Sequence, residues 1–266
     1  MTGLDAKRER LERILGEIGS ALVAYSGGVD STLLLKVARD VLGDKVEALT
    51  ATSPTYPESE LNEAVSLART IGVTQHVVDS NELDIPGYAD NPADRCYHCK
   101  KELFAICAAK AAERGLSSVC DGTTCDDLGD YRPGRRAAGE FAVRSPLLEA
   151  GFTKEDVRAL SRKLGLPTWD KQPYACLASR FPHGVRITAG RLGMIERCEE
   201  FLKSEGFRCY RVRYHGDTAR IELGRDEIGR MLDESMRRRV VDAFTAAGFR
   251  YVAVDLEGYR TGSMNP

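Results

Sequence analysis

The chain has 266 residues, which is enough for one or two domains with a sizeable hydrophobic core. Its 38 Lys and Arg nearly balance 40 Asp and Glu, so the formal net charge is −2 and the composition lacks a basic nucleic-acid-binding character. Apolar runs are too short to span a membrane, and the N-terminal segment has the pattern of a charged amphipathic helix. We therefore expect a globular cytoplasmic protein with no membrane partner, and we consider a nucleic-acid partner unlikely.

The first half of the chain alternates strand and helix patterns. Apolar residues at helical spacing predict helices from Val29 to Val41, from Pro57 to about Ile71 and over most of Ala93–Arg114. Repeated βα units predict an α/β fold, a parallel sheet with helices on both faces, whose ligand lies beyond the carboxyl ends of the strands. The predicted strands are Ala21–Tyr25, Val46–Thr52, Gln75–Asp79 and Ser118–Asp121.

A glycine-rich turn, Ser26-Gly27-Gly28-Val29-Asp30-Ser31, follows the first strand and opens the first of these helices. Glycines allow close backbone approach to a ligand, and the free N–H groups of a helix start favour phosphate or pyrophosphate. An ordinary strand-to-helix turn is the alternative, and for Asp30 so is a simple acid in the first helical turn. The full string is more specific and resembles the PP-loop of the ATP pyrophosphatases. The expected nucleotide-binding residues lie in this turn and at two other strand ends: Ser26, Gly27, Gly28, Asp30, Ser31, Thr52, Asp121 and Gly122.

Later segments are less regular. Leu128–Arg144 reads as a loop over the site, and Thr153–Leu164 as a short helix capped by Thr153. The pattern then becomes irregular, and we place a domain boundary there, between 1–170 and 171–266. The last part has the order βαββαβ, which is typical of a smaller α+β, ferredoxin-like domain. Its predicted elements are Val185–Thr188, Arg191–Ser204, Cys209–Tyr214, Thr218–Leu223, Glu227–Ala247 (helical, in one or two pieces) and Tyr251–Asp255.

Eight cysteines in a large chain of a reducing compartment favour metal or catalytic roles over disulfides. The pair in Cys96-Tyr97-His98-Cys99 suits half of a zinc site, a redox pair or an iron–sulfur centre, and its residues alone leave these open. Cys176 lies in the irregular boundary, where Lys171 and Arg180 could hold it as a thiolate; a buried structural cysteine is the alternative. That structural role suits the cysteines within predicted helices and strands: Cys107, Cys120, Cys198 and Cys209.

Taken together, these segments resemble the LarE family of ATP-dependent sulfur transferases, over nearly the whole chain. The resemblance rests on the turn Ser26–Ser31, the segment Cys96–Lys101, the string Cys176–Arg180 and the tail Asp255–Asn265. It implies adenylation of a carboxylate of pyridinium-3,5-biscarboxylic acid mononucleotide and its conversion to a thiocarboxylate, in biosynthesis of the nickel-pincer nucleotide of lactate racemase. It also implies ATP and Mg²⁺ as cofactors and a homo-oligomer built from trimers.

The family has two subtypes, which differ in the source of the sulfur. In one, a single cysteine matching Cys176 gives up its own sulfur and becomes dehydroalanine. In the other, three cysteines hold a [4Fe–4S] cluster in which one iron lacks a protein ligand. This chain has Cys96, Cys99 and Cys176, so it resembles the cluster subtype, with these three as metal ligands and Cys176 as the catalytic residue.

The substrate implied by the resemblance carries a phosphate. Arg211 and Arg213 alternate on a predicted strand and face the same side, which suits a phosphate, and Arg180 is the next candidate. A solvated strand face is the alternative for the pair. Glu199 and Glu200 read as exposed helix charges, with metal binding as the alternative.

Other functions remain open from the residues. A tRNA thiolation enzyme shares the loop and the cluster chemistry but favours basic patches. A PP-loop amidotransferase or synthetase using ammonia needs none of the three cysteines. A nucleotide-binding regulatory module is a non-enzymatic alternative.

Overall fold

The computed structural model describes residues 3–129, 134–172 and 176–260. The chain divides into two compact units. The first unit consists of Met1–Glu82 and Asp94–Tyr174, and the second consists of Leu83–Ala93 and Ala175–Pro266. The described residues leave out two segments next to or within the strings that carry the family resemblance. These are residues 173–175, just before Cys176, and residues 261–265 of the tail. The division of the chain into 1–170 and 171–266 stays a prediction.

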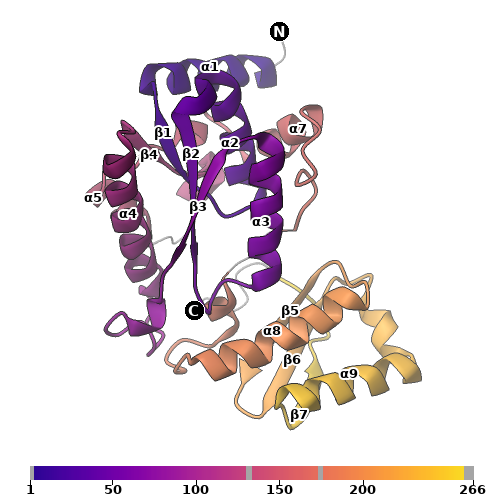
Figure 1. Ribbon diagram of the computed structural model, residues 1–266. Coiled ribbons are helices and arrows are strands. Elements are labelled where there is room, and N and C mark those ends of the chain that lie inside the picture. The colour runs from indigo at the N-terminus through magenta and orange to yellow at the C-terminus, as the bar shows by residue number, and fades with distance from the viewer. Residues whose placement is uncertain (1–2, 130–133, 173–175, 261–266) are drawn as a thin grey trace. The chain divides into compact units, whose positions relative to one another are not determined.

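The first unit contains a four-stranded parallel sheet with the order β3-β2-β1-β4 (Figure 1). Ala21 pairs with Val46 of β2 on one side and with Ser118 of β4 on the other, so β1 lies in the middle of the sheet. The predicted parallel α/β fold is confirmed, with strand ends within one residue of those expected. The strands are β1 Ala21–Ala24, β2 Val46–Thr52, β3 Thr74–Asp79 and β4 Ser118–Cys120.

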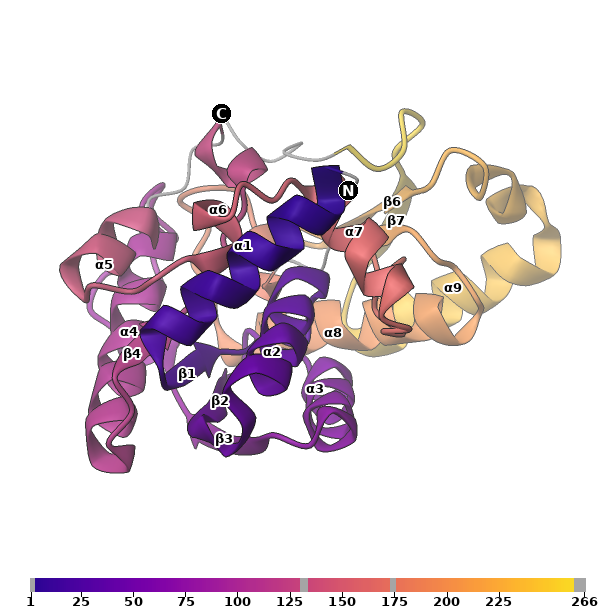
Figure 2. The same cartoon turned by 90° about the horizontal axis from the view of Figure 1, so that it is seen from above.

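Helices cover both faces of this sheet, as the repeated βα pattern predicts (Figures 1 and 2). Side chains alternate along a strand, so Ala21 and Val23 enter the core beneath α1 and α2, whereas Leu22 packs with Cys107 and Ala111 of α4. The helices are α1 Gly3–Ile18, α2 Val29–Leu42, α3 Glu58–Ile71, α4 Arg95–Arg114, α5 Gly134–Glu140, α6 Pro146–Glu149 and α7 Lys154–Lys163.

The expected loop over Leu128–Arg144 is wrong in part, because it contains α5. Ala137 of α5 is fully buried and packs with Tyr97 and Phe104 of α4. A segment rich in Gly and Arg has little apolar periodicity, so this short helix is stabilised by its tertiary contacts.

The second unit contains helix α8 Ala189–Ser204, strands β5 Tyr210–His215 and β6 Thr218–Leu223, helix α9 Glu234–Ala247 and strand β7 Tyr251–Val254. Its sheet has the order β5-β6-β7, with an antiparallel hairpin and a parallel third strand. The predicted α+β class is confirmed. Of the two possibilities left open for the last helical segment, one piece or two, the structure has two, a 3₁₀ turn at Ile228–Leu232 and α9.

The first strand of the predicted βαββαβ order does not form. In place of a strand at Val185–Thr188, Thr188 caps α8 by accepting from the Arg191 amide at 3.3 Å. The Ile187 amide donates to Ala89 O at 2.7 Å, so its backbone partner lies in the segment 83–93. The small sheet therefore has three described strands.

The segment 83–93 joins the second unit through a buried asparagine. The Asn91 side-chain amide donates to the carbonyls of Phe181 at 3.2 Å and Pro182 at 2.7 Å, and the Gly184 amide donates to Asn91 O at 3.1 Å. Asn91 has φ 57°, a left-handed conformation that asparagine tolerates better than most residues. These bonds explain why a segment from the middle of the first half packs with residues after 175.

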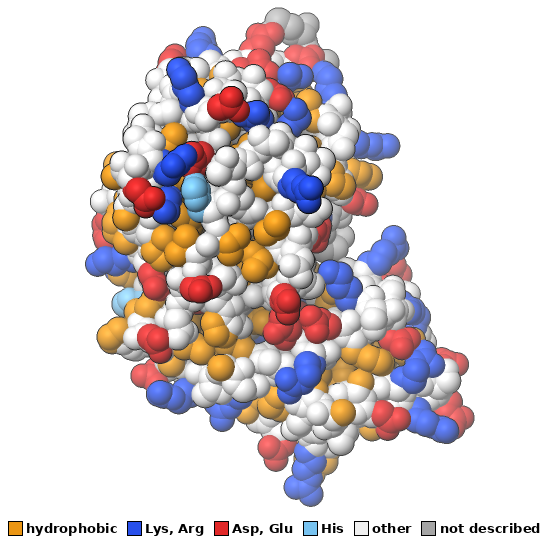
Figure 3. All heavy atoms as spheres, viewed as in Figure 1, with side chains coloured by type: hydrophobic (Ala, Val, Ile, Leu, Met, Phe, Trp, Pro, Cys, Tyr) orange, Lys and Arg blue, Asp and Glu red, His pale blue; other side chains and the backbone are white. Residues whose placement is uncertain are grey.

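On the face shown in Figure 3, acidic and basic side chains are interspersed. This agrees with the near-balance of charge in the sequence. Among the described residues, no helix has the length and apolarity to cross a membrane.

Candidate functional site

The glycine turn lies at the point where the strand order reverses. From β1 the chain adds β2 and then β3 on one side, whereas β4 pairs with the other side of β1. Ligands of open parallel sheets bind outside the carboxyl ends of the strands at such a reversal. Ser26–Ser31 follows β1 and Gly122 follows β4. A Cβ on Gly122 would lie 3.0 Å from Ser31 N, so the two predicted loops are in contact.

The first glycine of the turn has a structural reason. Gly27 has φ 65°, and a Cβ there would lie 2.7 Å from the Cβ of Ala64 on α3. Gly28 is the N-cap of α2 with an extended conformation. The hydroxyls of Ser26 and Ser31 are 3.2 Å apart, and Tyr56 donates to Ser26 O at 2.9 Å. The turn is thus held in a fixed shape at the start of α2, where backbone N–H groups favour an anion.

A lysine outside the predicted motifs lies over this turn. Lys154 Nζ, at the start of α7, is 2.5 Å from Asp30 Oδ2 and 3.4 Å from Asp127 Oδ2. Burial raises the pKa of the Asp30 carboxyl, and the charge of Lys154 opposes that rise. Thr153 caps α7 with Asp156, as predicted, and this cap fixes where Lys154 begins the helix. A lysine directly after a helix cap is a common pattern. The local sequence around Lys154 therefore gives little indication of its contact with Asp30.

A second lysine also contacts the turn. Lys171 Nζ pairs with Glu60 at 2.8 Å and with Glu63 at 3.0 Å, and lies 3.4 Å from Gly27 O. The sequence suggests Lys171 as a cation for the Cys176 thiolate. In the structure its partners are instead the two glutamates of α3 and the turn.

Thr52 and Asp121 lie at strand ends as expected. The Thr52 carbonyl accepts from Ser80 N at 2.8 Å, and the Asp121 carboxylate accepts from the Thr123 and Ser145 hydroxyls, each at 2.7 Å. These bonds shape the loops after β2 and β4. Nucleotide contacts of both residues stay predictions.

The CxxC pair lies at the start of α4. Cys96 is exposed, whereas Cys99 is half-buried with its Sγ 3.6 Å from Oε1 of Glu82. Cys176 belongs to the second unit and is exposed at the start of the 3₁₀ turn Leu177–Arg180. Within the described part of the chain, no three His, Cys, Asp or Glu side chains already form a metal-binding group.

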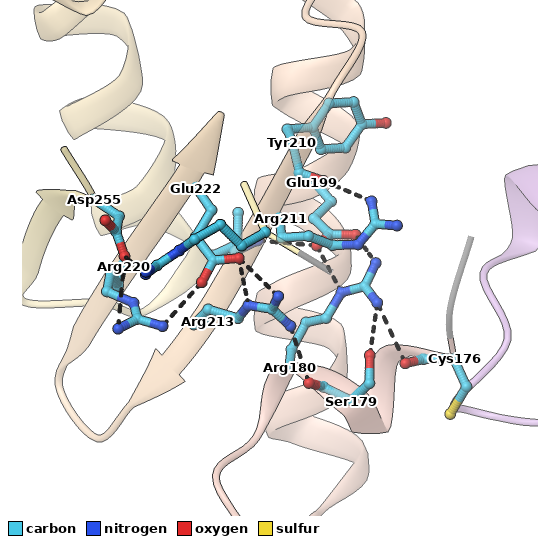
Figure 4. Close-up of polar contacts among 12 residues, drawn as sticks. Cys176, Ser179, Arg180, Glu199, Tyr210, Arg211, Arg213, Arg220, Glu222 and Asp255 are labelled. Atoms are coloured by element: carbon cyan, nitrogen blue, oxygen red, sulfur yellow. Dashed lines mark hydrogen bonds and ion pairs between the residues drawn. The ribbon is translucent and has the colours of Figure 1, made fainter. Parts of the chain in front are cut away.

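Arg180, four residues after Cys176, is fully buried in an ion pair (Figure 4). Its Nε and Nη2 donate to the two oxygens of Glu199, each at 2.8 Å, and its Nη1 donates to Ser179 Oγ at 2.9 Å. Burial raises the pKa of the Glu199 carboxyl. Arg180 and the Val212 amide together lower this pKa by more than burial raises it, so the pKa lies below its ordinary value. The expectation that Glu199 is an exposed helix charge is wrong; Glu200 is exposed.

The other two predicted arginines lie in the same cluster (Figure 4). Nε and Nη2 of Arg213 both donate to Glu222 Oε2, at 2.9 and 2.7 Å, and its Nη1 donates to Ser179 O at 3.1 Å. Arg211 is also buried and lies 5.1 Å from the ring centre of Tyr259. The solvated-face alternative for Arg211 and Arg213 is therefore wrong. The structure brings Arg180, Arg211 and Arg213 together, and the buried carboxylates of Glu199 and Glu222 orient Arg180 and Arg213.

The remaining cysteines fit structural roles where those were expected. Burial raises the pKa of the thiols of Cys107, Cys120 and Cys198 to about 12, which keeps them protonated. Cys209 is half-buried and its pKa is raised for the same reason.

No protein-family model matches the chain. The chain is 45% identical over 262 residues to the uncharacterized protein slr1717 of Synechocystis sp., covering 98% of each chain. It is 40% identical over 266 residues to pyridinium-3,5-bisthiocarboxylic acid mononucleotide synthase of Lactiplantibacillus plantarum, covering 100% of this chain and 96% of the relative. More distantly, it is 27% identical over 221 residues to the GMP synthase of Aeropyrum pernix, covering 76% of this chain and 43% of that enzyme.

The glycine turn at the reversal of a parallel sheet and the similarity to GMP synthase define an ATP-using enzyme of the PP-loop class. Within that class, the full-length similarity to the synthase of L. plantarum is decisive. The chain belongs to the LarE family of ATP-dependent sulfurtransferases.

Proposed function

We propose that this chain converts a carboxylate of pyridinium-3,5-biscarboxylic acid mononucleotide to a thiocarboxylate, in biosynthesis of the nickel-pincer nucleotide used in lactate racemase maturation. The observation that carries the proposal is the exposed Cys176 thiol at the family's sulfur position, directly before a cluster of buried arginines.

The first step is activation of the carboxylate. A carboxylate oxygen attacks the α-phosphorus of ATP, which gives an acyl-adenylate and releases pyrophosphate. The N–H groups at the start of α2, with Ser26, Gly27, Gly28 and Ser31, stabilise the charge of this leaving group. Thr52, Asp121 and Gly122 line the nucleotide at the neighbouring strand ends.

Asp30 and Lys154 set the charge beside the phosphates. The buried carboxylate of Asp30 suits Mg²⁺, which prefers oxygen ligands and binds phosphates with one or two carboxylates. Lys154 contacts both Asp30 and Asp127, so its ammonium group would lie beside a polyphosphate bound at the start of α2. Mg²⁺ supplies charge neutralisation on the leaving group when bound.

The phosphate of the substrate binds Arg180, Arg211 and Arg213. The cluster combines four arginines, including Arg220, with the carboxylates of Glu199, Glu222 and Asp255, so it carries a surplus of positive charge. Two hydrogen bonds from Arg180 to Glu199 and two from Arg213 to Glu222 hold these guanidinium groups in fixed planes, which lowers the entropy lost on binding a phosphate.

Sulfur then displaces AMP from the acyl-adenylate. The donor chemistry of Cys96, Cys99 and Cys176 suits a [4Fe–4S] cluster, because the first two lie one helical turn apart and all three are at least partly exposed. Such a cluster would supply a replaceable sulfur. In the alternative route, the Cys176 thiolate attacks the acyl carbon, AMP leaves, and β-elimination yields the thiocarboxylate and dehydroalanine.

The family resemblance extends the proposal to a cytoplasmic enzyme that forms a homo-oligomer built from trimers. Size-exclusion chromatography with light scattering tests the oligomer directly. Masses that are not multiples of three chains would contradict it.

Intact-protein mass after one anaerobic turnover separates the two sulfur routes. The cluster route leaves the protein mass unchanged, whereas the sacrificial route lowers it by one H₂S. In the cluster route, Cys96→Ala also lowers the iron content and the broad visible absorption. A protein mass that falls with each product formed would overturn the cluster route and leave the reaction class intact.

The tRNA thiolation alternative has its own test. RNA binding with a steep salt dependence would favour it, because such binding releases counterions from the phosphate backbone. The interspersed charges on the face in Figure 3 favour the small-molecule substrate.

A further inference from the structure

Two side chains outside the glycine turn bind its backbone carbonyls. The Tyr56 hydroxyl donates to Ser26 O at 2.9 Å, and the Lys171 ammonium group donates to Gly27 O at 3.4 Å. Tyr56 lies between β2 and α3, and Lys171 follows α7. Both residues belong to the first unit, so these contacts lie within one compact part of the chain.

These two bonds fix the direction of the amides that follow. The peptide bonds of the turn are trans, and a trans peptide is planar with its C=O and N–H bonds on opposite sides. Because the Ser26 carbonyl faces Tyr56, the Gly27 N–H points away from Tyr56. In the same way, the Gly28 N–H points away from Lys171. The Gly28 amide is 3.4 Å from Ser26 Oγ, which is longer than a usual N–H···O bond, so an anion at a shorter distance is the better acceptor.

Both donors are held in place with their protons. Burial raises the pKa of the Tyr56 hydroxyl, so this group remains a donor at neutral pH. Lys171 Nζ lies between the carboxylates of Glu60 and Glu63, and Arg158 of α7 donates to Lys171 O at 2.9 Å. Lys171 is therefore fixed against the turn from both α3 and α7.

Lys171 also offsets a negative charge beside the turn. Helix α3 lies against Gly27, because a Cβ there would be 2.7 Å from the Cβ of Ala64. Glu60 and Glu63 are on this same helix, and their two carboxylates would repel a phosphate bound at the turn. The ammonium group between them reduces this repulsion.

Amides that point outward from a glycine turn at a helix start bind phosphate oxygens. We propose that Tyr56 and Lys171 are positioning residues of the glycine turn, each holding one carbonyl so that the amide of the same peptide faces a pyrophosphate group. The inference rests on the proposed function, in which this turn binds the pyrophosphate that ATP releases. It adds to that site two residues outside the string Ser26–Ser31.

The two peptides of the turn can be observed one at a time. Ser26–Gly27 and Gly27–Gly28 are the only Ser-Gly and Gly-Gly pairs in the sequence, so labelling serine or glycine carbonyls with ¹³C and glycine amides with ¹⁵N gives one NMR signal for each. A hydrogen bond to a carbonyl polarises its peptide, and the ¹⁵N shift reports that polarisation. In the ligand-free protein, Tyr56→Phe should move the Gly27 signal more than the Gly28 signal, and Lys171→Met should do the reverse.

Calorimetric titration with inorganic pyrophosphate and Mg²⁺ measures the consequence for binding. We expect the Kd to rise roughly three- to tenfold in Tyr56→Phe, which loses one neutral hydrogen bond. In Lys171→Met the Kd should rise by about tenfold or more, because the two glutamates then also repel the ligand. Lys171→Arg keeps the charge and a donor, so its Kd should stay within about threefold of the wild-type value.

Two matched controls change the same residue types elsewhere. Lys36→Met alters a solvent-exposed pair with Asp40 further along α2, and Tyr251→Phe alters a tyrosine of β7 that is 54% exposed. Both should bind pyrophosphate like the wild type, with both NMR signals unmoved. Circular dichroism and thermal unfolding establish that each variant is folded; if Lys171→Met does not fold, Lys171→Gln replaces it, with the same expected direction.

Wild-type affinity for pyrophosphate in Tyr56→Phe and the Lys171 variant, or NMR signals that neither change moves, would overturn the inference and leave the proposed ATP site intact. A wild type that binds no pyrophosphate would overturn both. The titration contains no substrate for sulfur transfer, so failure of sulfur transfer does not affect its outcome.

Discussion

Lys154 Nζ lies 2.5 Å from the carboxylate of Asp30, so a cation from α7 covers the first turn of α2 at the glycine loop. Lys154 comes 124 residues after Asp30 in the chain. The contact joins the predicted phosphate nest to a residue outside any motif. In the proposed function this positive charge lies beside the polyphosphate.

Replacing this lysine should weaken nucleotide binding more than it weakens the fold. In Lys154→Met the lost charge-assisted contact should raise the Kd for ATP roughly 10- to 100-fold. The Asp30–Lys154 pair is partly exposed, so the free energy of unfolding should change by no more than about 1 kcal/mol. Calorimetric titration with Mg·ATP and thermal unfolding measure the two effects. The control is Lys163→Met at the other end of α7, where Lys163 pairs with Asp5. Unchanged ATP affinity in Lys154→Met would remove Lys154 from the site.

The two glycines of the loop should respond differently to alanine. Gly27→Ala forces a left-handed conformation that costs about 1–2 kcal/mol, and its Cβ would also clash with Ala64. Gly28 has φ −76°, and its nearest neighbour for a Cβ is Ser26 Oγ at 3.3 Å, so Gly28→Ala should be milder. Chemical denaturation and ATP binding compare the pair. Equal losses in both variants would contradict the conformational argument.

The buried Arg180–Glu199 pair should contribute strongly to stability. Glu199→Gln leaves Arg180 without its counter-charge and should cost about 3–5 kcal/mol, as for other broken buried pairs. Glu200→Gln, one residue further and exposed, should change stability by about 0.5 kcal/mol or less. Chemical denaturation of the two variants measures the difference, and equal stabilities would contradict a structural role for the pair.

This pair also predicts a pH dependence. The pKa of Glu199 is lower in the folded state than its ordinary value of 4.5, so its stabilising effect is complete above pH 4.5. It is lost as the pH falls below 4.5 through the folded-state pKa. Denaturation curves of the wild type should therefore lose stability over that range more steeply than those of Glu199→Gln. Parallel pH profiles would show that Glu199 titrates alike in the folded and unfolded states.

Arg211→Lys tests the proposed phosphate site. Lysine keeps the charge but lacks the planar fork that matches a phosphate. We expect the KM for the substrate nucleotide to rise roughly tenfold while the Kd for ATP stays unchanged, because the proposed ATP site is the turn Ser26–Ser31. Arg250→Lys, a change on a different arginine next to β7, serves as the control. A KM that stays at the wild-type value would assign the substrate phosphate to other residues.

Local patterns predicted most of the fold. The strands Val46–Thr52 and Thr218–Leu223 have the predicted bounds because apolar runs and turn residues delimit them. The strand at Val185–Thr188 failed because the segment 83–93, held by Asn91, supplies the backbone partner of Ile187. Such a partner is a tertiary contact that no local pattern records.

The same limit applies to the candidate site. The glycine turn and the cysteines were visible because their residue types and spacing carry chemistry. The sequence did not indicate the roles of three charged residues, Lys154, Glu82 and Glu222. A lone charged residue on a helix or strand is usually solvated, so its residue type alone predicts no special contact. Their roles depend on the residues that face them, Asp30, Cys99 and Arg213.

The most direct measurement of the central claim is a single anaerobic turnover with ATP, Mg²⁺ and pyridinium-3,5-biscarboxylic acid mononucleotide, with nucleotides and product identified by mass. The account predicts that the wild type and Cys198→Ala, a change at a buried cysteine, form AMP and thiocarboxylate in equal amounts. It predicts that Cys176→Ala forms the acyl-adenylate and pyrophosphate without thiocarboxylate. Thiocarboxylate from Cys176→Ala at the wild-type rate, or none from the wild type, would contradict it.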